Sequence, residues 1–410
     1  MIASEKRARF GYQPALDGVR ALAMALVVLV HYPWGVASIR PKPFGGGFLG
    51  VDAFFVLSGF LITTLLLQEH ARFGAVSLRR FYARRALRLL PALAVLLVIA
   101  CVLHVTLAAK DPNRPETNGL LGAAFYVANW VGIYQPRAVG VIFDTWSLAI
   151  EEQFYVVWPL ILVLLLTRRV RARTLALLTA GGIAASAAWR AWYWNDHLHH
   201  LHQTTYTGTN KLLALVAAEA NNHRLLGVWQ RIYFGSDTRA DSLLAGCLTA
   251  ILLFFLLPRL GDRARSRLGW LAWGALLAAG VIIWRAVYIF SGWLPDWGFL
   301  AFAVAIGVLI AGLVASPGNP VSRVLALAPL AWLGRRSYAI YLFHPLVFAY
   351  LDRQHVHLSP PLSFVFQVGV ILVVGELSYR LVEAPMLRRK TRFEARDDGT
   401  IRRRASSESV

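Results

Sequence analysis

The residues best suited to chemistry are an arginine and a histidine in the first apolar run, Leu16 to His31. Arg20 and His31 are eleven positions apart, which in an α-helix is three turns plus roughly 20°, so both belong to one face. The same spacing separates them by roughly 16 Å along the axis. The pair predicts a cation at one membrane surface and a titratable base deeper inside, a frame suited to a long ligand with an anionic head. The alternative is that both residues only anchor the ends of a membrane helix.

A carboxylate opens the second apolar run, Gly45 to Thr64. Asp52 lies near an expected helix start, where the helix dipole alone would explain a negative charge. Because this run returns beside the first through a short connection, we also expect Asp52 to meet His31 and support its protonated form. Ser58 and Gly59 permit close approach of a neighbouring helix or of a ligand.

Two pairs of closely spaced like charges stand out further along the chain. Arg85 and Arg88 share a helix face at i and i+3, a fork that suits phosphate, although topology anchoring is an equal alternative. Glu151 and Glu152 enter an apolar span together, which is costly unless they line a polar cavity. Either glutamate is a candidate acid or base, or a partner for an acceptor hydroxyl.

Other histidines give weaker signals. Tyr338, Tyr341 and His344 recur every three residues, yet core packing explains the tyrosines and a buried histidine more often donates a hydrogen bond than catalyses. Four histidines follow Asp196 within a long polar segment. Such a cluster is more typical of a solvated surface than of a metal site, so we predict no metal ion.

Composition indicates the fold class. The 410 residues are 57% hydrophobic and 16% charged, with a mean hydropathy of +0.53, which is more apolar than a soluble domain. We therefore predict an all-α polytopic membrane protein, a bundle of about ten transmembrane helices. The expected spans are 17–36, 47–67, 90–109, 145–166, 174–194, 240–257, 268–290, 297–315, 326–351 and 362–383.

The net charge of +20 is better explained by cytoplasmic loops facing anionic lipid than by nucleic acid. Every second loop is rich in arginine, which predicts that both termini are cytoplasmic and that the chain crosses the inner (plasma) membrane. The expected external segments, 110–144 and 195–239, are long enough to form a wall or lid for an acceptor.

Five stretches, in this order and spacing, resemble the acyltransferase 3 family of integral membrane acyltransferases. They are Arg-x10-His at Arg20 and His31, the run Gly50 to Phe60, the Arg-x-x-Arg of Arg85 and Arg88, the run Trp146 to Tyr155, and the run Ser337 to His344. The resemblance covers residues 12–390, after a cytoplasmic N-terminal segment, 1–11, and before a basic tail, 391–410, expected to be disordered. It implies a stand-alone transferase without the hydrolase-like domain that some members carry.

The resemblance implies transfer of an acyl group, usually acetyl, from acyl-CoA to a hydroxyl of a sugar, glycolipid, polysaccharide or glycosylated metabolite. The implied catalytic residues are His31 as general base, Asp52 as its support, and Glu151. The implied substrate-binding residues are Arg20, Arg85 and Arg88 for the CoA phosphates, with Ser58, Glu152, Tyr155 and His344. No bound cofactor is expected. A proton-coupled transporter using the same histidine and carboxylates is the alternative.

Overall fold

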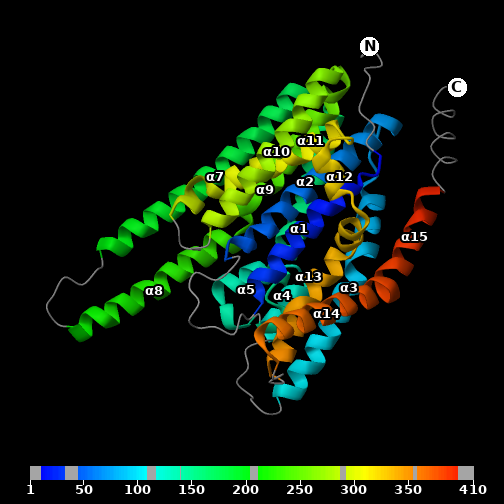
Figure 1. The fold of residues 1–410 in the computed structure, drawn as a ribbon. Coiled ribbons are helices and arrows are strands. Elements are labelled where there is room, and N and C mark those ends of the chain that lie inside the picture. The colour runs from blue at the N-terminus through cyan, green and yellow to red at the C-terminus, as the bar shows by residue number, and fades with distance from the viewer. Residues whose placement is uncertain are drawn as a thin grey trace.

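A computed structural model shows a bundle of long helices. It describes residues 11–32, 45–108, 117–138, 140–203, 211–286, 292–353 and 358–395, and those ranges contain no β-strand. The long helices run side by side, and the pair α7 and α8 projects beyond the rest of the molecule (Figure 1). The predicted all-α fold is confirmed.

The helices have the following bounds. The long ones are α1 (Pro14–His31), α2 (Gly50–Phe73), α3 (Leu78–Ala108), α6 (Thr145–Thr167), α7 (Ala172–Gln203), α8 (Lys211–Phe234), α9 (Ser236–Leu256), α10 (Asp262–Arg285), α11 (Phe299–Ala315), α13 (Ala328–Arg353) and α14 (Pro360–Ser378). The shorter ones are α4 (Thr117–Ala124), α5 (Ala128–Tyr134), α12 (Pro320–Leu325) and α15 (Ala384–Ala395). Single turns of other helix types are η1 (Gly45–Leu49), η2 (Pro136–Ala138), η3 (Gly140–Ile142), η4 (Leu257–Arg259), η5 (Leu294–Gly298) and η6 (Tyr379–Glu383).

Eight helical segments of the described chain are long and apolar enough to cross a membrane. They coincide with eight of the ten expected spans. The other two expected spans, 174–194 and 326–351, form α7 and α13, which are not among these eight and pack along α9 and α1 respectively. The chain is therefore a multi-pass membrane protein.

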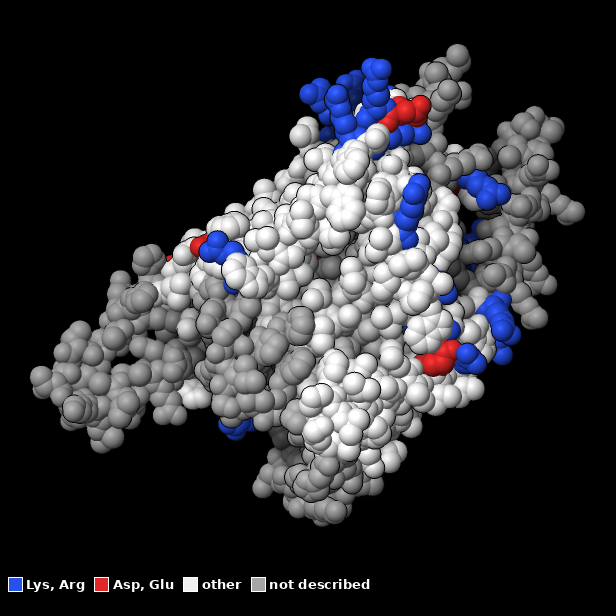
Figure 2. Space-filling model, viewed as in Figure 1, with Lys and Arg blue, Asp and Glu red and all other residues white. Residues whose placement is uncertain are grey.

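Charge is distributed as a membrane protein requires. Figure 2 shows basic side chains gathered over the turn between α9 and α10, above a face that is largely uncharged. This turn carries Arg259, Arg263, Arg265 and Arg267. A broad uncharged face bounded by arginines fits a lipid-facing surface with a cationic margin.

The expected external segments are mainly helical where the structure describes them. Segment 110–144 holds α4, α5 and two short turns, and segment 195–239 holds the end of α7 and all of α8. The expected segment 1–11 lies outside the described residues except for Gly11. Of the expected tail, α15 includes residues 391–395, and the rest lies outside the described residues.

Helices α2 and α9 cross at two glycines. A Cβ atom added to Gly59 would lie 1.9 Å from the carbonyl oxygen of Leu243, and one added to Gly246 would lie 1.9 Å from that of Val56. The two backbones therefore touch, as small residues allow in membrane helices. This contact explains Gly59 as a helix-packing residue and fixes α2, which carries Ser58 one position earlier.

We expect Gly59→Ala to destabilise the protein, because the new methyl group forces α2 and α9 apart. The cost should be about 1–3 kcal/mol, measured as a lower thermal unfolding temperature of the detergent-purified chain. Gly274→Ala on α10 is the matched control, since nothing lies within 4 Å of its Cβ position. Equal unfolding temperatures for the two variants would contradict the packing role.

Candidate functional site

A cavity of about 170 Å³ lies among α1, α2, α3, α6 and α13. Seven of the residues singled out from the sequence line it: Arg20, Ser58, Arg85, Arg88, Glu151, Glu152 and Tyr155. Apolar side chains such as Phe54 and Leu61 complete the walls. Residues from four distant stretches of sequence therefore meet in one place.

Three guanidinium groups give this cavity a cationic side. Arg20 and Arg85 both lie close enough to Arg88 to repel its charge. The guanidinium of Arg85 lies over the ring of Tyr155, 4.3 Å from its centroid, which holds it in place by a cation–π contact. Arg20 donates a hydrogen bond of 2.7 Å to Asp17. An anionic ligand with several phosphate oxygens would relieve this repulsion.

Both glutamates line the cavity, and Glu151 is held firmly. The hydroxyls of Ser58 and Tyr155 donate to its two carboxylate oxygens at 3.1 Å and 2.9 Å. Tyr155 is one helical turn after Glu151 on α6, whereas Ser58 reaches across from α2. This face of α6 therefore packs against α2 and places a hydrogen-bonded carboxylate on the cavity wall.

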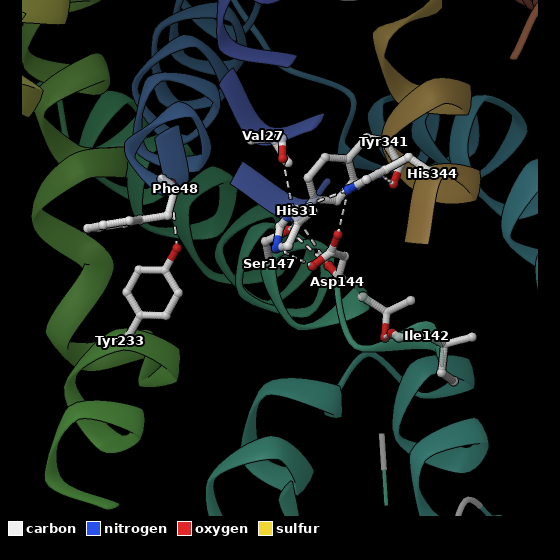
Figure 3. Close-up of polar contacts among 10 residues, drawn as sticks. Val27, His31, Phe48, Ile142, Asp144, Ser147, Tyr233, Tyr341 and His344 are labelled. Atoms are coloured by element: carbon white, nitrogen blue, oxygen red, sulfur yellow. Dashed lines mark hydrogen bonds and ion pairs between the residues drawn. The ribbon is translucent and has the colours of Figure 1, made fainter. Parts of the chain in front are cut away.

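Behind the cavity, one carboxylate lies between two imidazoles (Figure 3). Asp144 Oδ2 is 3.0 Å from His344 Nε2, and Asp144 Oδ1 is 3.6 Å from His31 Nε2. The two histidines also approach each other, with His344 Nε2 3.3 Å from His31 Nδ1. The side chains of Asp144 and His344 are buried, while that of His31 is 34% exposed. We call these three residues the His–Asp–His cluster.

The histidine rings are oriented by backbone carbonyls. Pro345 has no N–H, so the Tyr341 carbonyl, four residues earlier, loses its usual helical partner. The Nδ1 of His344 takes that place and donates to the Tyr341 oxygen at 2.7 Å. The Nδ1 of His31 likewise contacts the carbonyl oxygen of Val27 at 3.0 Å. Because a carbonyl only accepts, each Nδ1 carries a proton, and each Nε2 is turned toward Asp144.

Asp144 is an ionised carboxylate in this setting. Its burial acts to raise the pKa of Asp144, but the nearby His31 and His344 rings and the hydrogen bond from His344 outweigh burial and hold that pKa below its usual value. The residue precedes α6 as its N-cap, yet its side chain makes no capping hydrogen bond. Its orientation toward the histidines is therefore not explained by helix capping.

A pair of hydroxyls separates the cavity from the His–Asp–His cluster. Ser147 and Tyr341 line the cavity, and their hydroxyl oxygens are 2.5 Å apart. Both hydroxyls also donate to the backbone oxygen of Asp144, at 3.2 Å and 3.1 Å. Among the described residues, His31 is not part of the cavity lining. The Ser147–Tyr341 pair therefore closes the inner end of the cavity in this conformation.

The predicted contact of Asp52 with His31 is wrong. Asp52 is fully buried and forms an ion pair with Arg239, and its Oδ1 accepts a hydrogen bond of 2.9 Å from Ser242. Both partners come from α9, because the glycine contact presses α9 against α2 at this level. The carboxylate that reaches the histidines is instead Asp144, which the sequence analysis overlooked. Its only signal was a lone acid just before the Trp146 to Tyr155 run, where a capping residue is commonplace.

The fold and site define a multi-pass membrane protein whose cationic cavity adjoins a buried histidine–carboxylate cluster. The family model described as "Acyltransferase domain" matches residues 13–379. The chain therefore belongs to this acyltransferase family, as the five motifs predicted. No solved structure matches the chain.

Curated relatives resemble this chain over most of its length. A putative O-acetyltransferase of Staphylococcus aureus strain MSSA476 is 31% identical over 93% of this chain and 58% of its own length. The peptidoglycan O-acetyltransferase OatA of Listeria monocytogenes is 30% identical over 92% of this chain and 56% of its own. The O-acetyltransferase OatA of S. aureus strain NCTC 8325 is 31% identical over 94% and 58%. The chain thus spans less than two thirds of these relatives.

The two acids should respond differently to substitution. Asp52→Ala leaves Arg239 buried without its counter-ion, so we expect a loss of about 3–5 kcal/mol in stability, seen as a lower thermal unfolding temperature. Asp144→Asn keeps the side-chain shape beside two rings that can lose protons, so unfolding should change little. A larger drop in unfolding temperature for Asp144→Asn than for Asp52→Ala would contradict this expectation and assign the main stabilising role to Asp144.

Proposed function

We propose that the protein transfers an acetyl group from acetyl-CoA to a hydroxyl of a carbohydrate acceptor. The observation that carries this proposal is the adjacency of two features: three arginines converge on one cavity, and the inner wall of that cavity touches the His–Asp–His cluster. The first suits a nucleotide phosphate group, and the second suits proton removal from a hydroxyl. Family membership and the names of the relatives support acyl transfer, whereas nothing in them supports the transporter alternative.

The donor enters from the cytoplasm in this proposal. Arg20, Arg85 and Arg88 hold the CoA phosphates, and the pantetheine arm follows the cavity toward Ser147 and Tyr341. Glu151 orders the cavity wall through Ser58 and Tyr155, and Glu152 adds a second acid to the same lining. This direction agrees with cytoplasmic termini in the plasma membrane, because arginine-rich ends face the cytoplasm.

The tautomer and the exposure of His31 support it as the base. His344 Nδ1 donates to the Tyr341 carbonyl, and its Nε2 lies 3.0 Å from Asp144 Oδ2. In neutral His31, the Nδ1–H on the Val27 carbonyl leaves the lone pair on Nε2. His31 is also the exposed member of the cluster, so an acceptor hydroxyl has access to it.

In this proposal the acetyl group passes directly from the thioester to the acceptor oxygen. His31 Nε2 takes the proton of the acceptor hydroxyl while the oxygen attacks the thioester carbonyl carbon. The carbon–sulfur bond breaks, and the CoA thiolate leaves and recovers the proton. Asp144, 3.6 Å from His31, stabilises the imidazolium that forms in between. Because Ser147 and Tyr341 close the cavity, they must part before the thioester and His31 meet.

The acceptor class is proposed from the relatives. The Listeria relative is named a peptidoglycan O-acetyltransferase. A hydroxyl on a cell-envelope carbohydrate is therefore the first acceptor to test, with glycolipids and glycosylated metabolites as further members of the panel. The assay follows labelled acetyl groups from acetyl-CoA into each acceptor, using membranes that contain the chain.

Removing one cavity arginine should weaken donor binding. We expect Arg85→Ala to raise the KM for acetyl-CoA by about 10- to 100-fold, because a charged hydrogen bond to phosphate is lost. Arg84→Ala is the matched control, since Arg84 is the adjacent residue but pairs with Glu69 at 3.2 Å. A KM that rises equally in both variants would argue for a general charge effect rather than a phosphate site.

Removing the base should slow the chemical step. We expect His31→Ala to lower kcat by about 100- to 10,000-fold, the usual contribution of a positioned base, while the KM for acetyl-CoA changes little. Asp144→Asn should lower kcat in the same direction. Initial rates at saturating acetyl-CoA measure both effects, and full activity in a folded His31→Ala protein would end the proposal.

A further inference from the structure

We propose that the His–Asp–His cluster binds a divalent transition-metal ion, zinc being the best match, and that zinc binding blocks acetyl transfer. Binding is argued from the cluster alone, while its inhibitory effect rests on the function proposed above. The proposal departs from the sequence analysis, which predicted no metal site.

The geometry of the cluster is close to that of a three-ligand zinc site. His31, Asp144 and His344 each offer one nitrogen or oxygen atom, and these atoms lie within 4.8 Å of one another. In a tetrahedral site with bonds of about 2.0–2.1 Å, neighbouring ligand atoms are about 3.3 Å apart. His344 Nε2 is 3.0 Å from Asp144 Oδ2 and His31 Nε2 is 3.6 Å from Asp144 Oδ1, so a small rotation of the carboxylate would bring one oxygen to a similar distance from both nitrogens.

The surroundings of the two histidines match those of metal ligands. A ligating histidine usually donates its other ring N–H to a carbonyl or carboxylate, which fixes the tautomer. Here Val27 and Tyr341 supply those carbonyls, at 3.0 Å and 2.7 Å. Both Nε2 atoms then lie near the Asp144 carboxylate, and zinc would bind between the three side chains.

The types of ligand atom in the cluster and the exposure of His31 indicate which ion it would bind. Two imidazole nitrogens and one carboxylate oxygen suit zinc and its neighbours, whereas calcium and magnesium prefer all-oxygen ligands. His31 is 34% exposed, so an ion can enter from its side and keep a water as fourth ligand. Once its lone pair is on the metal, His31 cannot accept a proton from an acceptor hydroxyl.

Another histidine-rich segment supplies the control. His197 Nδ1 lies 3.8 Å from Asp196 Oδ2 on α7, and three more histidines follow in the sequence, His199, His200 and His202. A variant with all four changed to glutamine removes this competing source of zinc ligands. It leaves the His–Asp–His cluster unchanged.

The test is a zinc titration by calorimetry of the purified full chain in detergent. We expect one tight equivalent in the wild type and in the four-histidine variant. His31→Gln and Asp144→Asn should each weaken zinc binding by at least about 10-fold. Loss of an outer-shell partner already costs that much, and these variants change the ligands themselves. Thermal unfolding of each variant confirms that it is folded. Magnesium should not bind. Zinc affinity should decrease as the pH is lowered, because protons then compete with zinc for the imidazole nitrogens.

Transfer assays then test the inhibition separately. Zinc should abolish acetyl transfer in the wild type and in the four-histidine variant, and a chelator should restore it. Unchanged zinc affinity in His31→Gln and Asp144→Asn, or its loss in the four-histidine variant, would overturn the site. Tight binding with undiminished transfer would overturn the inhibition. A zinc-free wild type without transfer activity would count against the proposed function, while the calorimetry would still decide the metal site.

Discussion

The arrangement of the site depends on one shared carboxylate. Asp144 is buried at the start of α6 and lies against the imidazoles of His344 and His31, which come from opposite ends of the chain. Burying a charge is costly unless it has partners, and the imidazoles of His31 and His344 are the partners that this position supplies. The helices α1, α6 and α13 therefore have to meet at this point, and the cavity between them follows from that meeting.

A second set of buried charges holds the neighbouring helices in place. Asp52 pairs with Arg239, and Arg190 pairs with Asp241 at 2.7 Å, so α2, α7 and α9 are tied together by charges with no exposed surface. Arg190 also donates to the backbone oxygen of Pro295, which adds η5 to the group. These contacts hold α7 at Arg190, just before the part of α7 that projects from the bundle together with α8 (Figure 1).

Sequence reasoning predicted the residues on helix faces better than the contacts between helices. Arg85, Arg88 and Glu151 reach one cavity because helical periodicity decides which way each side chain points. The partner of Asp52 was predicted wrongly because it depends on how closely α2 and α9 approach at their glycines, a tertiary property that periodicity does not contain. Asp144 was overlooked for a related reason, since an acid before a helix is so often only a cap.

Asp144 is the N-cap of α6 and Glu151 lies on that helix seven residues later, about 10 Å along the helix axis. The cavity wall and the carboxylate of the His–Asp–His cluster therefore belong to one rigid helix. A movement of α6 along its axis that displaces Glu151 also displaces Asp144 and changes its distance to His31. In the proposed reaction, occupancy of the cavity and the environment of the base are therefore coupled through α6.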